Sequence, residues 1–382
     1  MVRISNRNLE DEFIHEFITD LKVDLTARGL SKATIKFTNR NYMFTDHELL
    51  RGENLTVDIF GGWAETRMFK WGTFYAAVPR YMFRNTASPF INLTCYGQEW
   101  PLALSEERRV YENRRDSEIA ELIARRNRLR TDIEQTDAVY EHVAQVAMTD
   151  MEFLENRSLL YGYDVYVENG VLHFHKPRLA RSPTTLFFSG GERGVLEKFD
   201  VTVDPWVKGS RWVKSGIDRI TGEEWELTSD GALDAAAQGI VSTGGRGFKR
   251  GSAISGVDGV QPTRHIIGDG HDLSVEEARA QVDGYAKASE WVTVASAKLR
   301  GLEFMQPRES VKIVGAGHLS GEYYVTRVVH TINARSGFST KFEVTRPGVG
   351  RLNDIYRPRV QTGAKRRDVS GDSATVGQAS IQ

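Results

Sequence analysis

The feature that most constrains this chain is an internal repeat of β-strand segments. Three pairs of segments recur in the same order with similar loop lengths: residues 57–61 with 311–315, residues 72–78 with 321–327, and Leu93 and Cys95 with Phe342 and Val344. Self-similarity of this kind indicates that a structural unit has been duplicated. Any two antiparallel β segments can also resemble each other by chance. If the repeat is real, the chain holds two copies of one β domain, and residues 230–300 interrupt the second copy.

Composition places the chain among ordinary globular proteins. Its 382 residues, 40% apolar and 26% charged, allow roughly two to four domains with buried cores. The formal net charge of -1 does not indicate binding to nucleic acid, to a membrane surface or to an acidic substrate.

The single cysteine, Cys95, excludes an internal disulfide framework and a zinc site built on paired cysteines. No apolar run is long enough to span a membrane, and the first residues lack the apolar stretch of a signal peptide, so we expect synthesis in the cytoplasm and no membrane insertion.

Periodicity predicts strands first and helices next. Residues 21–100 carry short β-branched and aromatic runs that stop at glycines, and they predict a small β domain. From residue 105 to 135 apolar side chains recur at helical spacing, which predicts a helix with a solvated, arginine-rich face. A second helix is predicted over 137–148, because Tyr140, Val143 and Ala147 share one helical face.

The next segment carries the clearest local signals. Thr149 and Glu152 form a capping box that opens a third helix, and Gly162 is placed to end it in a left-handed conformation. Asn169-Gly170, with alternating apolar residues on both sides, predicts a β-hairpin. Residues 105–175 are therefore predicted to form a compact unit of three helices and a hairpin.

The second half of the chain returns to strands. The sequence predicts strands over 186–227, a long glycine-rich loop over 229–272, a helix over 274–299 capped by Ser274, and strands over 311–345. From Arg346 to Arg367 seven basic residues accompany the single acidic residue Asp354, and residues 368–382 are small and polar. We expect residues 368–382 to be a disordered tail that can order on a partner, and residues 346–367 either to pack against a partner or to stay solvated and disordered.

One loop is a candidate for acid/base or metal chemistry. Gly268-Asp269-Gly270-His271-Asp272 places a histidine between acids, so Asp269 and His271 form the candidate pair. A turn before a helix uses the same residue types, and the loop holds only one histidine, so the sequence favours a turn.

The glycines around Arg246 lack the Gly-Lys-Ser/Thr ending of a phosphate-binding loop. Cys95 lies on an apolar strand face and is predicted to be part of a core.

A histidine pair is the other candidate. His173 and His175 alternate with Phe174 on a strand and share a face, an arrangement that can chelate a metal ion. No third metal-binding residue lies at a spacing typical of a metal site. The alternative is that the two histidines are ordinary polar residues on the solvent face of a hairpin. The sequence therefore predicts no catalytic residue, no cofactor and no metal ion, and it leaves the residues that contact partners unassigned.

Two longer motifs carry a resemblance to a known family. The first is Val143–Arg157, with Gln145 followed by Thr-Asp and Phe-Leu, and it continues through Tyr161-Gly162-Tyr163 to the hairpin that ends at Phe174. The second is residues 321–330, Gly-Glu-Tyr-Tyr-Val-Thr-Arg-Val-Val-His, with residues 337–344, Gly-Phe-Ser-Thr-Lys-Phe-Glu-Val. In this order they resemble the baseplate hub family. That family comprises the late control D proteins of contractile-tailed phages, the Mu-like tail hub and the hub part of type VI secretion spike proteins. The resemblance covers about residues 10–347, and the glycine-rich 238–260 region departs from it.

The resemblance implies a particular α+β architecture. It has two tube-like antiparallel β-barrel domains, an intervening helix-hairpin domain and an insertion in the second barrel. The expected domains are 1–104 for the first barrel, 105–178 for the helical and hairpin domain, 179–229 with 301–346 for the second barrel, 230–300 for the inserted loop and helix, and 347–382 for the basic and then polar tail.

The function that the resemblance implies is mechanical. In such hubs, trimers of two-barrel chains make a ring of six barrels, which lets a threefold spike dock on a sixfold tail tube. We therefore expect a non-enzymatic homotrimeric adapter in the baseplate of a virion tail, made in the host cytoplasm. Its expected partners are the tail tube, the central spike and other baseplate proteins, with DNA or the tape-measure protein passing through its channel.

Two alternatives stay open at this point. One is a tail-associated peptidoglycan hydrolase in which Asp269 and His271 act, and the other is the hub of a type VI-like secretion spike. The sequence does not distinguish a phage from a phage-derived injection system, nor a contractile from a flexible tail.

Overall fold

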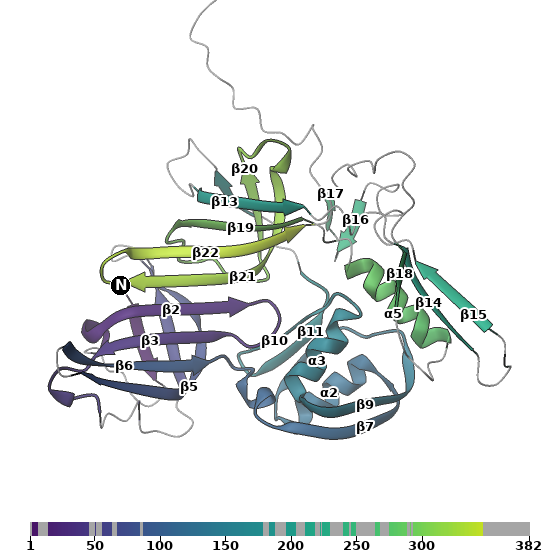
Figure 1. Ribbon diagram of the computed structural model, residues 1–382, viewed down its shortest axis with the longest axis horizontal. Helices are drawn as coiled ribbons and strands as arrows, with labels where there is room; N and C mark the ends of the chain where they lie inside the picture. The colour runs from purple at the N-terminus through teal and green to yellow at the C-terminus, as the bar shows by residue number, and fades with distance from the viewer. Residues whose placement is uncertain are drawn as a thin grey trace, which may run out of the picture.

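The computed structural model shows an α+β protein dominated by antiparallel sheet (Figure 1). It describes residues 2–6, 14–45, 50, 56–62, 67–84, 87–178, 183–187, 196–203, 211–217, 222, 224–229, 240–243, 246–249, 264–267, 275–288, 291 and 293–346. Among these residues no helix has the length and apolar character that crossing a lipid bilayer requires. The short 3-10 helices are η1 (Ile14–Phe17), η2 (Arg40–Tyr42), η3 (Trp100–Ala103) and η4 (Gly317–Leu319).

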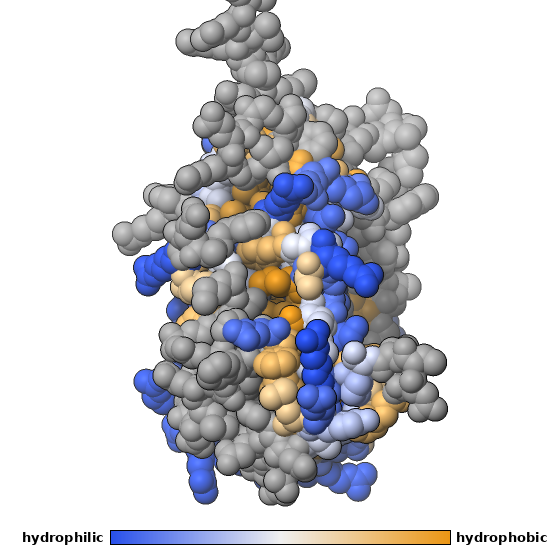
Figure 2. Space-filling model, turned by 90° about the vertical axis from the view of Figure 1, so that its left-hand side faces the viewer, coloured by the Kyte–Doolittle hydropathy of each residue, from blue (hydrophilic) through white to orange (hydrophobic). Residues whose placement is uncertain are grey.

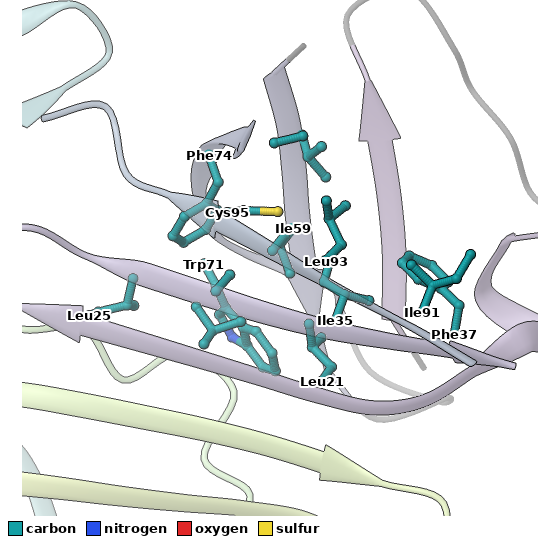
Figure 3. Packing of buried hydrophobic residues seen from close by; sticks show 14 of the residues in the cluster. Leu21, Leu25, Ile35, Phe37, Ile59, Trp71, Phe74, Ile91, Leu93 and Cys95 are labelled. Carbon is teal, nitrogen blue, oxygen red and sulfur yellow. The ribbon is translucent and has the colours of Figure 1, made fainter. Parts of the chain in front are cut away.

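The first part of the chain builds one half of a large sheet. Its strands are β1 (Val2–Asn6), β2 (Ile18–Thr26), β3 (Lys32–Thr38), β4 (Thr56–Gly61), β5 (Phe69–Arg84) and β6 (Ala87–Tyr96), in the antiparallel order β1-β4-β5-β6-β3-β2. Alternate residues point to one side, where Leu21, Ile35 and Leu93 pack around Trp71 and Phe74 (Figure 3). The strands predicted for residues 21–100 are confirmed where the structure describes the chain.

The last part of the chain builds the other half. Its strands are β12 (Thr184–Phe187), β13 (Leu196–Val203), β19 (Thr293–Arg300), β20 (Ser310–Val314), β21 (Gly321–Asn333) and β22 (Gly337–Arg346). They lie in the order β12-β20-β21-β22-β19-β13, antiparallel except for the parallel pair β12 and β20. Their inward side chains form a second core, which includes Val311, Ile313, Tyr323, Val325 and Phe342.

The two halves of the sheet are copies of each other. Ala76 lies opposite Cys95 across β5 and β6, and Val325 lies opposite Val344 at the same place in β21 and β22. Both ladders shift register directly after this pair. The copies extend beyond the recurring segments, because β3 and β2 stand next to β6 as β19 and β13 stand next to β22. The predicted repeat is thereby confirmed.

The second copy is interrupted between β13 and β19. The interrupting segment contains β14 (Arg211–Ile217), β15 (Glu224–Ser229), β16 (Ile240–Thr243), β17 (Arg246–Lys249), β18 (Arg264–Ile266) and α5 (Val275–Ala288). β15, β14 and β18 form a separate small sheet, and β16 pairs with β17. The glycine-rich region predicted as a loop thus holds three short strands, and the rest of it lies outside the described residues.

The helix predicted over 274–299 is too long. α5 ends at Ala288, and residues 293–300 form β19, in which buried and exposed side chains alternate. Alanine and lysine favour helices in isolation, but β19 is held between β13 and β22 by ladders on both sides, so sheet pairing decides its conformation.

The middle of the chain forms a unit of its own. Its elements are β7 (Glu106–Arg115), α2 (Asp116–Arg126), β8 (Arg130–Ile133), β9 (Val139–Thr149), α3 (Asp150–Leu159), β10 (Asp164–Glu168) and β11 (Val171–His175). The predicted capping box is confirmed, because Glu152 N–H donates to Thr149 Oγ1 and Thr149 N–H donates to Glu152 Oε2. Gly162 has φ +65°. The Asn169-Gly170 hairpin joins β10 and β11 as predicted.

Two of the helices predicted in this unit are wrong in whole or in part. The helix predicted over 105–135 is confined to α2, because residues 106–115 and 130–133 are strands. The helix predicted over 137–148 is wrong, because those residues lie in β9, which pairs with β7. The register of this pair omits Asn113, whose φ is 50°. Tyr140 and Val143 both face the core although they are three residues apart, a spacing that imitates a helix in the sequence.

Candidate functional site

The two copies of the sheet are joined directly, and we name this contact the seam. It consists of the β2–β21 ladder, over residues 20–26 and 327–333, and the packed side chains of Trp71 and His330. Both strands alternate buried apolar and outward polar residues, so one register lets them share a core face. The ladder makes one continuous sheet from segments that lie at opposite ends of the chain (Figure 1).

The side chains of Trp71 and His330 pack against each other across the seam. Their rings are stacked, with centroids 4.3 Å apart and planes 7° from parallel. The indole Nε1–H of Trp71 donates to the carbonyl oxygen of Glu303 at 2.8 Å. Gly61 packs so closely that a Cβ there would lie 1.8 Å from the indole ring. The first copy therefore inserts a side chain that the second copy both stacks on and hydrogen-bonds.

His330 is held as a neutral imidazole. Its Nε2 lies 3.0 Å from the carbonyl oxygen of Met305, which only accepts, so Nε2 carries the hydrogen. Its Nδ1 lies 3.1 Å from Thr340 Oγ1, which also accepts from Leu302 N–H, so the hydroxyl donates to Nδ1. Burial lowers the pKa of His330 to about 4. Both ring nitrogens are committed, so His330 has no proton to exchange with a substrate.

A second contact joins the middle unit to the large sheet, and we name it the junction. It lies where the three-stranded sheet β10-β11-β8 meets the ends of β2, β6 and β21. Its side chains are Arg28, Glu99, Asp164, Tyr166, Arg308 and Tyr324. The seam also contains an ion pair, between Arg327 and Asp24, but that pair is partly exposed, whereas the two acids of the junction, Glu99 and Asp164, are buried.

Asp164 is the centre of the junction. The Tyr324 hydroxyl donates to its Oδ2, and Arg28 Nε lies 3.4 Å from its Oδ1. Within the described part of the chain, that Oδ1 has no hydrogen-bond partner of ordinary geometry. Burial raises the pKa of Asp164, and the positive charge of Arg28 opposes that rise. The junction thus holds a buried carboxylate that depends on two side chains of the large sheet.

Next to Asp164, the junction contains a stack of side chains made by Arg308, Tyr166 and His173. The Arg308 guanidinium lies 3.7 Å from the centre of the Tyr166 ring, and the Tyr166 ring is also stacked on the His173 ring, with centroids 4.4 Å apart. Arg308 also donates to the carbonyl oxygen of Thr26 at 3.0 Å. One cation therefore links β2, the second copy and the middle unit.

Glu99 is the other buried acid of the junction. It follows β6, and its Oε1 accepts from the backbone N–H of Val167 on β10 at 3.4 Å. Its Oε2 has no hydrogen-bond partner among the described residues. Burial raises the pKa of Glu99 to about 7, against the opposing effect of backbone hydrogen bonds and Arg308. Beside the junction lies a hollow of about 360 Å³ lined in part by Arg28, Asp164 and Tyr324.

The two predicted histidines gain a third neighbour from another strand. β8 runs parallel to β11 and places Asp132 opposite His173. Asp132 Oδ2 lies 3.0 Å from His173 Nδ1 and 3.8 Å from His175 Nε2. Asp132 could not be predicted from the sequence, because a parallel pairing between distant strands leaves no spacing signal in the chain. These three side chains are the group among the described residues that is placed to hold a metal ion.

Two of the remaining sequence candidates, Asp269 and His271, lie outside the described residues. Cys95 is fully buried in the first core, as predicted, and burial raises the pKa of its thiol to about 12, so it is a poor nucleophile. Tyr324 and His330, which carry the junction and the seam, stood in the family motif without an assigned role.

Comparison with known families gives one match. A family model described as the Alg8 N-terminal domain matches residues 45–334. The chain belongs to this family. In this member of the Alg8 N-terminal domain family the matched segment includes the middle unit, the insertion and most of the seam. No curated protein sequence matches the chain.

Solved structures show which fold this Alg8 N-terminal domain family member has. A tail protein from Neisseria meningitidis MC58 is 11% identical, with a TM-score of 0.63 over 93% of this chain and 99% of that one. A 43 kDa tail protein of prophage MuSo2 from Shewanella oneidensis is 10% identical, with a TM-score of 0.61 over 91% and 98%. An E. coli component of the type VI secretion system, described as similar to the T4 bacteriophage tail proteins gp27 and gp5, is 12% identical, with a TM-score of 0.53 over 93% and 79%.

These likenesses confirm the resemblance to the phage tail hub family at the level of fold. They cover nearly the whole chain, so they include both copies of the sheet and the middle unit. Two residues of the motifs that carried the resemblance, Tyr324 and His330, make contacts of the junction and of the seam.

Proposed function

We propose that the chain is a structural hub of a phage tail or a phage-like injection machine, and that it acts as a homotrimer. In this role it joins a sixfold tail tube to a threefold spike and surrounds the channel between them. The likeness of fold to tail proteins supports a place in the tail. The observation that carries the symmetry is the duplication, because three chains with two equivalent units each present six units to a tube.

The seam supplies a pattern for the contact between chains. Within the chain, residues 327–333 of β21 pair with β2 of the other copy. The equivalent part of β5, residues 78–84, pairs with β6 and with no other described strand. Val78 and Phe83 on this stretch are 54% and 57% exposed. An unpaired strand edge with exposed apolar residues can form a ladder with a strand of another chain.

β13 is the strand that fits this edge. It occupies in the second copy the place that β2 has in the first, and it is also an edge of the described sheet. Transferring the seam register to a neighbouring chain puts Val201 of β13 opposite Tyr81, and Phe199 opposite Phe83. Repetition of this contact closes a ring of three chains and leaves no β5 or β13 edge open.

In this proposal the two copies of the sheet correspond to the two tube-like domains. We propose that one is formed by β1 to β6 and the other by β12, β13 and β19 to β22, with closure supplied by neighbouring chains in the ring. Figure 2 looks onto one side of the molecule and shows apolar residues gathered in a strip beside hydrophilic ones. Such a strip is typical of a surface that an assembly covers.

The proposed partners are the tail tube, the central spike and other baseplate proteins, and the proposed location is the virion tail. A hub of a type VI-like secretion spike is the second candidate, favoured by the likeness to the E. coli secretion component. The two roles differ in the partners and share the trimer.

Native mass and a register-specific cross-link test the proposal. Light scattering should give three times the chain mass of 43.0 kDa. Cysteines at positions 201 and 81, in the variant Val201→Cys with Tyr81→Cys, should form disulfide-linked trimers under oxidation, because paired strand residues meet the Cα separation of roughly 4.4–6.8 Å that a disulfide needs. The buried thiol of Cys95 does not compete.

The matched control moves one cysteine by a single residue. Thr202→Cys with Tyr81→Cys puts the two thiols on opposite faces of the proposed pairing, so it should cross-link far less. A monomer by light scattering in the presence of its spike protein, or equal cross-linking of both variants, contradicts the proposed assembly.

A further inference from the structure

Three side chains on two strands present the donor set of a transition-metal site. Asp132 is on β8, and His173 and His175 are on β11, so their backbones are fixed by one ladder. Two imidazoles and one carboxylate are ligands that divalent ions of the zinc type prefer, whereas magnesium and calcium prefer oxygen alone. One ligand atom from each of the three lies within 4.8 Å of the other two.

The separations match a tetrahedral ion. An ion that lies 2.0–2.2 Å from each ligand in tetrahedral geometry holds its ligand atoms about 3.4 Å apart. The carboxylate Oδ2 of Asp132 lies 3.0 Å from His173 Nδ1 and 3.8 Å from His175 Nε2, on either side of that value. The ligand atoms of His173 and His175 lie within 4.8 Å of each other, so side-chain rotations that bring them closer together complete the site.

The surroundings hold His175 in the form that binds metal. Its Nδ1 lies 2.7 Å from the carbonyl oxygen of Lys176, which only accepts, so Nδ1 carries the hydrogen and Nε2 offers its lone pair. Such a second hydrogen bond is the usual support of a metal-bound histidine. His173 is fixed by its stack against Tyr166.

A hydrogen bond already brings two of the ligands together. His173 Nδ1 lies 3.0 Å from Asp132 Oδ2, and because a carboxylate oxygen only accepts, Nδ1 carries the hydrogen. A metal ion bound between the two residues takes the place of this hydrogen, and the neutral ring then carries its hydrogen on Nε2.

Arg178 is the competitor for the site. Its Nη1 and Nη2 donate to Asp132 Oδ2 and Oδ1 at 2.7 and 2.9 Å. Its side chain is 62% exposed, so it can withdraw into solvent at little cost. Without metal, Arg178 neutralises Asp132; with metal, the ion takes Oδ2 and Arg178 keeps at most Oδ1.

We propose that Asp132, His173 and His175 form a binding site for a divalent transition-metal ion of the zinc class, with Arg178 as a displaceable cation. The ion would tie β8 to β11 and so fix the small sheet that carries Asp164 and Tyr166 into the junction. Three protein ligands leave a fourth position for water or for a side chain of another protein.

Titration of the full chain with Zn²⁺ and Co²⁺ tests the site. After chelator treatment, calorimetry should show one Zn²⁺ per chain, and Co²⁺ should give the visible absorption of a tetrahedral site. His175→Ala should lower the Zn²⁺ affinity by at least about 100-fold, beyond what loss of an outer-shell partner costs. Asp132→Asn, which keeps the size of the side chain, should do the same. Arg178→Ala should raise the affinity by about tenfold, because a competing charge is removed.

The matched control is His142→Ala, which removes an exposed histidine on β9 and should leave the affinity unchanged. Circular dichroism without metal shows whether each variant is folded, and if His175→Ala is not, His175→Gln and Asp132→Asn carry the comparison. The proposal is overturned if the folded wild-type chain gives no tetrahedral Co²⁺ spectrum, or if Zn²⁺ binding is the same in the ligand variants as in His142→Ala. None of these readouts depends on the oligomer, so the proposed hub function can fail independently.

Discussion

The seam and the junction both join parts of the molecule that are distant in sequence, but they do so by different chemistry. The seam combines a backbone ladder and the partly exposed Arg327–Asp24 ion pair with the stacked, buried rings of Trp71 and His330. The junction combines two buried acids, Glu99 and Asp164, with the hydroxyl of Tyr324 and with arginines. Packing against a ladder contributes apolar burial and fixes one register. Buried carboxylates contribute little net stability and make a contact sensitive to its partners and to pH.

This difference gives the two contacts opposite responses to pH. The seam contains a histidine that must stay neutral, so acid weakens it. The junction contains acids that burial favours in their neutral form, so raising the pH weakens it. The chain thus has its stacked rings, with a titratable histidine, between the two copies, and its buried acids beside the middle unit.

The largest expected effect is at the seam. Trp71→Ala should lower the free energy of unfolding by about 3–5 kcal/mol, because it removes a buried ring that no neighbour can replace. Chemical denaturation of the wild type and variant measures the change. Trp100→Ala, which removes a half-buried indole outside the seam, is the control and should cost clearly less. Equal losses for the two variants would mean that the seam has no special role.

The next effect tests the junction by pH. Glu99 has a pKa of about 7 when folded and 4.5 as its ordinary value, so the folded state binds the proton more tightly. Its contribution to stability is full below pH 4.5 and is lost as the pH rises through 7, a total of about 3 kcal/mol. Glu99→Gln does not titrate, so its stability relative to the wild type should increase by that amount between pH 4.5 and 8. A constant difference between the two proteins across this range contradicts the prediction.

The seam should respond in the opposite direction. The folded pKa of His330 is about 4 and its ordinary value is 6.5, so its contribution is present above pH 6.5 and is lost as the pH falls toward 4. By pH 5 the wild type should have lost about 2 kcal/mol through this group. His330→Gln should lack this loss, and the difference between the two unfolding free energies against pH measures it. If both proteins lose stability equally between pH 7 and 5, the seam histidine is not the responsible group.

The smallest effect isolates one hydrogen bond of the junction. Tyr324→Phe should cost about 1.5 kcal/mol at pH 7, because it removes the donor to a buried carboxylate, Asp164. Tyr323→Phe is the matched control on the same strand, since its hydroxyl donates to the neutral carbonyl oxygen of Leu319. A double-mutant cycle with Asp164→Asn measures the coupling, and a coupling near zero would remove Asp164 from the centre of the junction.

The parts of the fold that the sequence predicts are those made by neighbours in the chain. The capping box of α3 and the Asn169-Gly170 hairpin depend on residues within a few positions of each other, so their signals survive without tertiary structure. The helix predicted over 137–148 fails for the opposite reason. β9 owes its conformation to β7, and no short window of sequence contains both strands.

The candidate sites also contain a part that local sequence predicts and a part that only distant segments supply. The pairing of His173 with His175 on one face follows from the twofold period of a strand, and both residues could be named from the sequence. Asp132 could not, because it joins them through a parallel pairing across 41 residues. Tyr324 and His330 stood in a motif, but their roles depend on Asp164 and Trp71, which other parts of the chain supply.

The sequence alone therefore determined the duplication, the local signals and the likeness to a hub family, since all of these are written in residue order and periodicity. The tertiary structure decided how the copies join, where the buried acids meet and which residue completes the histidine pair. Contacts between distant segments depend on the register of strands, and register is set by the whole set of buried faces rather than by any single segment.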